Sequence, residues 1–136
     1  MREDMMRDKN SFKQPMMPWP SLEKYERIID VQGLDLNLFV FDSGRSSKPI
    51  IMLIHGLGDE ADTWRHVFEP LADLFRVIAV DLPGFGRSDK PDRDYTPKFM
   101  MDAILKLADH MDLSEIILMG SSMGAILAHS IALRNP

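Results

Sequence analysis

The stretch EIILMGSSMGAILAHS, residues 115–130, decides the fold. Its first half is an apolar run that ends at Gly120, and its second half has apolar residues at helical spacing. Ser122 lies between the two halves, with Gly120 and Gly124 on either side. A serine on a tight turn from strand to helix needs small neighbours two positions away, because the turn crowds them together. The stretch therefore predicts a buried strand, a sharp turn and a helix.

The rest of the chain alternates strand and helix patterns. Residues 25–31 and 34–42 read as two strands, and Leu34, Leu36, Leu38 and Val40 share one face of the second. Continuous apolar runs at 50–55, 77–80 and 115–119 predict three strands buried on both faces. Helical spacing occurs at 64–75, 97–111 and 123–134. This order predicts an α/β fold with a mostly parallel sheet of about five strands and helices on both faces.

Length and composition fit one soluble globular domain preceded by an arm. The chain has 136 residues, 45% of them hydrophobic and 27% charged. Within residues 1–20, Pro15, Pro18 and Pro20 exclude a helix around the prolines. We therefore interpret 1–20 as an N-terminal arm that can be flexible, and 21–136 as the domain.

Charge and residue usage exclude several classes of function. The net charge of -5 disfavours nucleic acid as a partner. The absence of cysteine excludes disulfides and thiolate metal sites, and the four histidines lack metal-ligand spacing. The N-terminus lacks a signal-peptide core, and no apolar run is long enough to span a membrane. We therefore expect a cytoplasmic protein without a metal or another cofactor.

Three glycine-containing loops follow the three buried strands, and the carboxyl ends of parallel strands gather at one edge of the sheet. The loops are HGLGDEADTW, DLPGFGRSDKP and GSSMG. The last matches G-x-S-x-G, which alone is a weak pattern, but its place between strand and helix favours Ser122 as a nucleophile. The backbone N–H of Met123 opens the new helix and favours an oxyanion, and we expect a second donor at Leu57, after His55-Gly56.

These three motifs, in this order and at these spacings, resemble the α/β-hydrolase fold superfamily over residues 25–136. The resemblance implies that Ser122 is the nucleophile and that the N–H groups of Leu57 and Met123 form the oxyanion hole. It implies structural roles in the elbow and loop for His55, Gly56, Gly120 and Gly124, and for Trp64, Gly84, Gly86 and Ser88. A serine at position 122 is similar to the esterase, lipase and carbon–carbon hydrolase branches, whereas dehalogenases and epoxide hydrolases carry aspartate there.

The partners of the nucleophile are missing from the sequence. In this fold an acid and then a histidine follow the serine, but the 14 residues after Ser122 contain neither Asp nor Glu. Their one histidine, His129, lies seven residues along the next helix, about 10 Å away, whereas a working base needs roughly 3 Å. His55 fits a structural role, and His66 and His110 fit surface positions on helices. We therefore expect no triad acid or base in this chain.

The resemblance implies further strands, a lid, and then the acid and the histidine. We interpret the chain as the N-terminal part of an α/β-hydrolase domain, ending after the nucleophile helix. The strand at 115–119 would then lack its next neighbour, and an apolar strand at an edge favours aggregation. We expect the isolated chain to be poorly stable, or to need the missing C-terminal half or another chain to complete its sheet.

The activity expected from the resemblance is hydrolysis of a small-molecule carboxylic ester through an acyl-enzyme on Ser122, with the 136-residue chain inactive alone. A carbon–carbon or amide bond is an alternative substrate, because the sequence does not show the lid and acyl pocket. A hydrolase-like binding protein without catalysis is a second alternative, favoured by the missing acid and base.

A third alternative is an NAD-binding domain of the Rossmann type. Residues 56–61, GLGDEA, fit G-x-G-x-x-G/A after a strand, and Asp81 ends the next parallel strand, where a ribose-binding acid would lie. Asp59 and Glu60 argue against it, because they would place two negative charges near a pyrophosphate. The two strands that precede the motif and the unexplained GSSMG turn argue against it as well.

Overall fold

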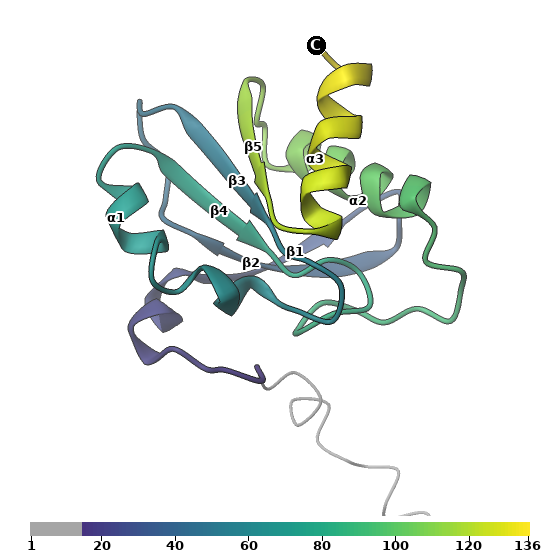
Figure 1. Cartoon of the computed structure of the whole chain (residues 1–136), viewed down its shortest axis with the longest axis horizontal. Helices are drawn as coiled ribbons and strands as arrows, with labels where there is room; N and C mark the ends of the chain where they lie inside the picture. The colour runs from purple at the N-terminus through teal and green to yellow at the C-terminus, as the bar shows by residue number, and fades with distance from the viewer. Residues whose placement is uncertain (1–14) are drawn as a thin grey trace, which may run out of the picture.

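The computed structural model describes residues 15–136, which form one five-stranded sheet flanked by helices (Figure 1). The strands lie in the order β1-β2-β4-β3-β5. Their bounds are β1 (Glu26–Val31), β2 (Leu36–Asp42), β3 (Ile50–Ile54), β4 (Arg76–Val80) and β5 (Ile116–Gly120). The helices are α1 (Phe68–Ala72), α2 (Pro97–His110) and α3 (Met123–Arg134), with 3₁₀ turns η3 (Pro20–Tyr25) and η4 (Ala61–Trp64). The predicted α/β class, with five strands and three α-helices, is confirmed.

The sheet is mixed, with an antiparallel beginning and a parallel remainder. β1 pairs antiparallel with β2, and β2 pairs antiparallel with β4. β3 lies between β4 and β5 and is parallel to both. The carboxyl ends of β3, β4 and β5 therefore share one edge, as the sequence predicted, and the three glycine-containing loops begin there.

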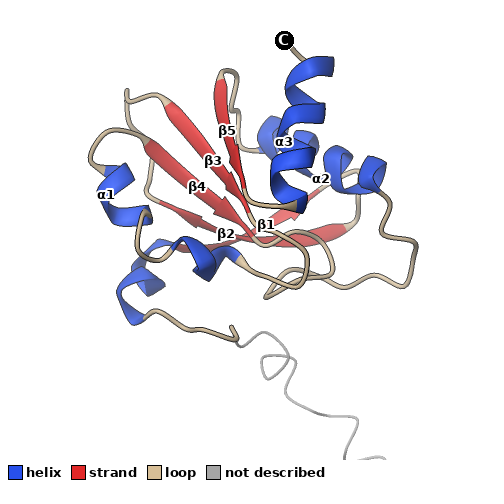
Figure 2. Cartoon of the chain, viewed as in Figure 1, coloured by secondary structure: helices blue, strands red, loops and turns tan. Residues whose placement is uncertain are grey.

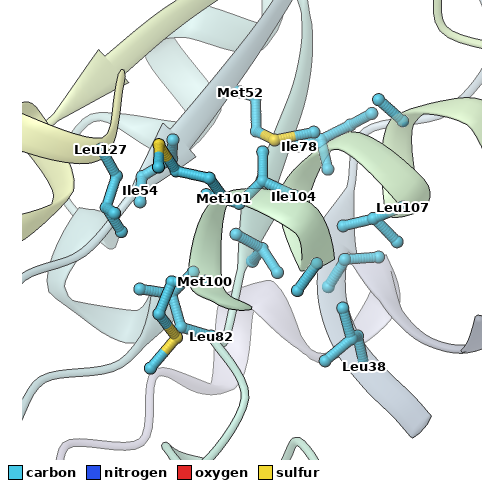
Figure 3. Close-up of a cluster of buried hydrophobic side chains, with 14 of the residues drawn as sticks. Leu38, Met52, Ile54, Ile78, Leu82, Met100, Met101, Ile104, Leu107 and Leu127 are labelled. Carbon is cyan, nitrogen blue, oxygen red and sulfur yellow. The ribbon is translucent and has the colours of Figure 1, made fainter. Parts of the chain in front are cut away.

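Hydrophobic cores lie on both faces of the sheet. Figure 2 shows α2 and α3 together on one side and α1 on the other. The core under α2 and α3 is drawn in Figure 3, where Met52 of β3 and Met100 and Met101 of α2 pack among leucine and isoleucine side chains. Strand β2 serves both cores, since Leu38 and Val40 face one and Phe39 and Phe41 face the other. The flexible methionines thus act as core filling.

Helix α2 begins where the sequence predicted. The side-chain hydroxyl of Thr96 accepts the backbone N–H of Phe99 at 3.1 Å, and Pro97 occupies the first helical position. Among the helices of residues 15–136, none is both long and apolar enough to cross a bilayer.

The predicted helix at 64–75 is wrong in its backbone. The chain forms η4, a turn, and then the five-residue helix α1. A continuous helix would place Pro70 in its interior, where proline lacks an N–H and its ring clashes with the carbonyl four residues earlier. The structure instead places Pro70 in the first turn of α1, and Trp64, Phe68 and Leu71 still pack in the second core.

Strand β5 is an edge strand in this chain, and the prediction that it is buried on both faces is wrong. Ile117 is 49% exposed and Met119 is 40% exposed, while the corresponding residues of β3 and β4 are covered. β5 pairs with β3 alone within residues 15–136. Ile117 and Met119 lie in register with Ile51 and Leu53 of β3, and the second core, which covers Ile51 and Leu53, does not extend to β5. The exposed apolar edge agrees with the expectation that the sheet needs a further neighbour.

We predict that Ile117→Lys reduces self-association of the chain, because a charge on an exposed apolar edge opposes strand pairing between molecules. Ile28→Lys is the matched control. Ile28 is 54% exposed on β1, at the opposite edge, where Glu26, Arg27 and Asp30 already supply charge. Size-exclusion chromatography with light scattering measures the association. A wild-type chain that is a monodisperse, cooperatively melting monomer would contradict the prediction.

Candidate active site

Ser122 occupies a strained turn between β5 and α3. Its backbone has φ 53° and ψ -119°, a region that residues other than glycine rarely adopt. The turn is held by Ser121, whose N–H donates to the Ile54 carbonyl at 3.1 Å and whose carbonyl accepts the Gly124 N–H at 2.9 Å. Ser122 is an exposed residue at the N-terminus of α3. The strain and the exposure are what a nucleophile on such a turn requires.

Glycines at 120 and 124 are required because backbone fills the space that a side chain would need. A β-carbon on Gly120 would lie 2.2 Å from the Gly124 carbonyl carbon. A β-carbon on Gly124 would lie 2.1 Å from the Ile54 carbonyl oxygen and 2.6 Å from that of His55. The start of α3 therefore rests directly on the end of β3, and this contact brings the loop after β3 beside Ser122.

Two backbone N–H groups are available near the serine. A β-carbon on Gly56 would approach the Ser121 carbonyl at 3.2 Å and the Ser122 β-carbon at 3.3 Å, so the His55-Gly56-Leu57 segment lies against the turn. Within residues 15–136, the N–H groups of Leu57 and Met123 donate to no protein acceptor. This arrangement suits a developing oxyanion.

His55 is fully buried between two backbone groups. Its Nε2 accepts the Leu82 N–H at 3.0 Å, and its Nδ1 lies 2.7 Å from the Gly56 carbonyl oxygen. The Phe85 ring packs against it edge to face, with ring centroids 5.5 Å apart. These contacts connect the loops after β3 and β4.

The remaining histidines form no hydrogen bond with Ser122 in the described chain. His129 is exposed on α3, seven residues beyond Ser122. His110 is exposed at the end of α2, and His66 is exposed with its ring 5.1 Å from that of Trp19. Residues 15–136 also contain no cluster of three or more side chains suited to hold a metal ion.

A buried ion network lies below the loops, and the sequence analysis missed it. The Asp81 carboxylate accepts the N–H of Ala61 at 2.6 Å and the N–H of Arg87 at 2.8 Å. The Arg87 guanidinium contacts Asp81 and Asp62, and it stacks 3.7 Å from the Phe39 ring centroid. The sequence held one sign of this network. Asp81 follows a buried strand and Arg87 lies six residues later, so the two opposite charges could have been predicted to pair.

The network explains the second glycine-containing loop. A β-carbon on Gly86, which has φ +54°, would lie 2.3 Å from an Asp81 carboxylate oxygen. The Ser88 hydroxyl donates to the Asp81 carbonyl at 2.5 Å and accepts the Phe39 N–H at 2.8 Å. Gly86 and Ser88 therefore shape the loop and anchor it to β2.

The same contacts overturn the NAD-binding alternative. Asp81 is fully buried, and its carboxylate is occupied by Ala61 and Arg87, so it presents no oxygen to a ribose. The segment after Gly58 leads into η4, a four-residue 3₁₀ turn, in place of a helix that could receive a pyrophosphate.

Glu60 connects the loop after β3 to the residues that precede the domain. Glu60 is 3% exposed, and its carboxylate accepts the Met17 N–H at 3.2 Å. Burial raises the pKa of Glu60, and the nearby Asp62 and Asp81 raise it further. Burial likewise raises the pKa of Asp62, although Arg87 opposes that effect. Residues 1–14 of the predicted arm lie outside the described residues.

A groove of about 770 Å³ lies beside the site, between α2, β5 and α3. Leu105, Ile116, Leu118 and Ala128 supply part of its apolar lining, and Gly120 also lines it. Ser122 does not line it. The groove lies along the edge strand β5, next to the turn that carries Ser122.

The family model for the alpha/beta hydrolase fold matches residues 49–136, which contain all three glycine-containing loops. The chain belongs to the alpha/beta hydrolase fold family. The match covers more than half of the chain and confirms the family resemblance that the three glycine-containing loops indicated.

Individual relatives of this alpha/beta hydrolase chain differ in function. A haloalkane dehalogenase of Mycolicibacterium paratuberculosis is 34% identical over 131 residues, which cover 90% of this chain and 44% of the dehalogenase. Epoxide hydrolase 3 of Xenopus tropicalis is 32% identical over 95 residues, which cover 68% of this chain and 26% of the epoxide hydrolase. The crystal structure of a bacterial membrane phospholipase A has a TM-score of 0.77 and 32% identity, covering 82% of this chain and 36% of the phospholipase. The chain thus spans less than half the length of these proteins.

We predict that Gly124→Ala destabilises the chain strongly, on the order of 4 kcal/mol or more, because its β-carbon would displace the carbonyls of Ile54 and His55. Gly58→Ala is the control in the same site. Gly58 has φ +73° but open space around it, so strain alone costs about 1–2 kcal/mol. Urea denaturation measures both. Equal losses for the two variants would show that the close contact is unimportant.

We predict a pH-dependent effect for Glu60→Gln. The folded-state pKa of Glu60 is raised above 4.5. The contribution of protonated Glu60 to the free energy of unfolding is therefore fully present below pH 4.5 and is lost as the pH rises through the raised pKa. Glu60→Gln keeps the acceptor for Met17 and avoids that loss. Urea denaturation at pH about 4 and about 7 is expected to show the variant gaining on wild type at the higher pH. The exposed Glu115→Gln is the control, and a gap that does not change with pH would refute the expectation.

Proposed function

We propose that this chain carries the nucleophile and the oxyanion hole of a serine hydrolase that cleaves carboxylic esters. The observation that carries the proposal is Ser122 itself, exposed on a strained turn at the start of α3 with the Leu57 segment against it. Strain of this kind costs on the order of 1–3 kcal/mol and is retained where a function needs it.

The reaction proceeds through an acyl-enzyme. The Ser122 hydroxyl oxygen attacks the ester carbonyl carbon while a base removes its proton, and a tetrahedral oxyanion forms. The N–H groups of Leu57 and Met123 donate to that oxyanion. The intermediate then expels the alcohol, which takes the proton back. Water, deprotonated by the same base, attacks the acyl carbon and releases the acid, which restores Ser122.

Serine chemistry separates this chain from the dehalogenases and epoxide hydrolases among its relatives. An aspartate that displaces a halide or opens an epoxide forms an ester, which water then cleaves. A serine attacking the same alkyl carbon would form an ether, which water does not cleave under these conditions. Ser122 therefore fits acyl transfer, and amides or activated carbon–carbon bonds next to a carbonyl are the alternative substrates of the same mechanism.

The base comes from outside residues 15–136 in this proposal. No histidine of the described chain forms a hydrogen bond with Ser122, and the relatives are more than twice as long as this chain. A strand that pairs parallel with the open edge of β5 would end next to the turn, because the carboxyl end of β5 is Gly120. We propose that such a segment supplies the triad acid and histidine and completes the sheet.

The test is labelling of the protein from its source cells with a fluorophosphonate, which reacts with activated serines. We expect an intact mass above the 15.6 kDa of this chain and one phosphonate adduct, located on Ser122. Ser122→Ala is expected to abolish the adduct, and Ser121→Ala, the matched control one residue earlier, to retain it.

A mass of 15.6 kDa without an adduct would overturn the proposal and favour the second candidate, a hydrolase-like binding protein. The observation that favours this candidate is the absence of an acid and a base near Ser122 in the described chain. If the adduct forms, hydrolysis of a series of short-chain esters and amides by the unlabelled protein distinguishes the substrate classes.

A further inference from the structure

We infer that His55 is a positioning residue, which holds the Gly56 carbonyl and thereby turns the Leu57 N–H towards the space over Ser122. The inference rests on the proposed function, because it explains how one of the two oxyanion donors is aimed. His55 itself is fully buried. Within the described chain its hydrogen bonds go to Gly56 and Leu82 and not to Ser122.

The hydrogen bonds define which nitrogen of His55 carries the proton. The Leu82 N–H is only a donor, so Nε2, at 3.0 Å, is the unprotonated acceptor. A neutral imidazole then carries its proton on Nδ1. The group opposite Nδ1, at 2.7 Å, is the Gly56 carbonyl oxygen, which is only an acceptor. Both contacts are satisfied by one tautomer, so His55 is a neutral donor to Gly56.

The geometry of the peptide unit transmits this contact to Leu57. The Gly56 carbonyl and the Leu57 N–H belong to the same peptide group, and in a trans peptide they point to opposite sides. Fixing the carbonyl towards His55 therefore fixes the N–H away from it. The Asp59 N–H also donates to the Gly56 carbonyl, at 3.2 Å, which strengthens the same orientation.

The anchor of His55 is buried. Leu82, whose N–H holds Nε2, is fully buried and follows Asp81, the centre of the ion network. On the other side, Gly56 has no side chain and lies against the Ser122 turn. The chain of contacts thus runs from the network through Leu82 and His55 to the peptide that carries the donor.

Two substitutions separate the two hydrogen bonds. His55→Asn keeps an amide N–H2 near the place of Nδ1 and can still donate to Gly56, but it loses the acceptor for Leu82. His55→Gln reaches the place of Nε2 and can accept from Leu82, but it loses the donation to Gly56. Both remove an imidazole from the core, so a purely structural role predicts similar losses for both.

The first measurement is the rate of Ser122 phosphonylation in the native protein carrying each variant, with the melting temperature of each as control. We expect His55→Gln to react about 10- to 100-fold more slowly than wild type, since loss of an oxyanion donor costs about 10²–10³ in kcat. We expect His55→Asn to stay within about threefold of wild type, because its donor keeps the peptide oriented. Equal rates for the two variants, or rates that follow melting temperature alone, would overturn the inference.

The second measurement needs neither a reaction nor a variant. Long-range ¹H–¹⁵N spectra of the histidine-labelled wild-type protein report the tautomer, and a proton on Nδ1 supports the inference whereas a proton on Nε2 overturns it. If wild-type Ser122 takes no label, the proposed function fails.

The inference about His55 is then decided by the tautomer and by a third measurement, hydrogen exchange of the Leu57 amide. We expect that exchange rate to change more in His55→Gln than in His55→Asn.

Discussion

The close contact between Gly124 and the carbonyls of Ile54 and His55 is the constraint on which the rest of the site depends. It sets the start of α3 directly on the end of β3, closer than any side chain permits. That distance places Ser122 beside the loop after β3, which carries Leu57, the proposed second oxyanion donor. The turn at Ser122 is strained because the chain must leave β5 and enter a helix at this short distance, and a positive φ is the result.

The loops around the turn are fixed by a different kind of interaction. Asp81 and Asp62 lie buried on either side of Arg87, and backbone N–H groups satisfy Asp81 further. Burying these charges costs free energy, which the contacts with the guanidinium and the Phe39 ring offset. What the network provides is geometry, since it joins η4, the loop after β4 and strand β2. His55 then extends this fixed geometry to the peptide beside Ser122.

The features that could be predicted from the sequence are those coded by neighbouring residues. The strand, turn and helix around Ser122 follow from small residues two positions away, and the start of α2 follows from Thr96 and Pro97. Other features depend on residues far apart in the chain. Asp62 and Arg87 are 25 residues apart, so spacing gave no sign of their contact. Asp81 is a second case. Its position at the end of a strand suited a ribose-binding acid, and only the folded structure shows that Ala61 and Arg87 occupy its carboxylate. Pro70 was a local signal that the helical spacing of 64–75 concealed.

The open edge of the sheet connects the stability of the fold with the chemistry of the site. α3 contacts β3, β5 and α2, but Ile126 and Leu133 on its other side are 67% and 70% exposed. The Ser122 turn is thus supported from the β3 side and left uncovered towards the outer side of β5. A segment that covers Ile117 and Met119 would bury apolar surface and would also restrain the strained turn from its open side. If the same segment carries the histidine, the nucleophile gains its base only when the sheet is complete, so an unassembled chain holds an unreactive serine.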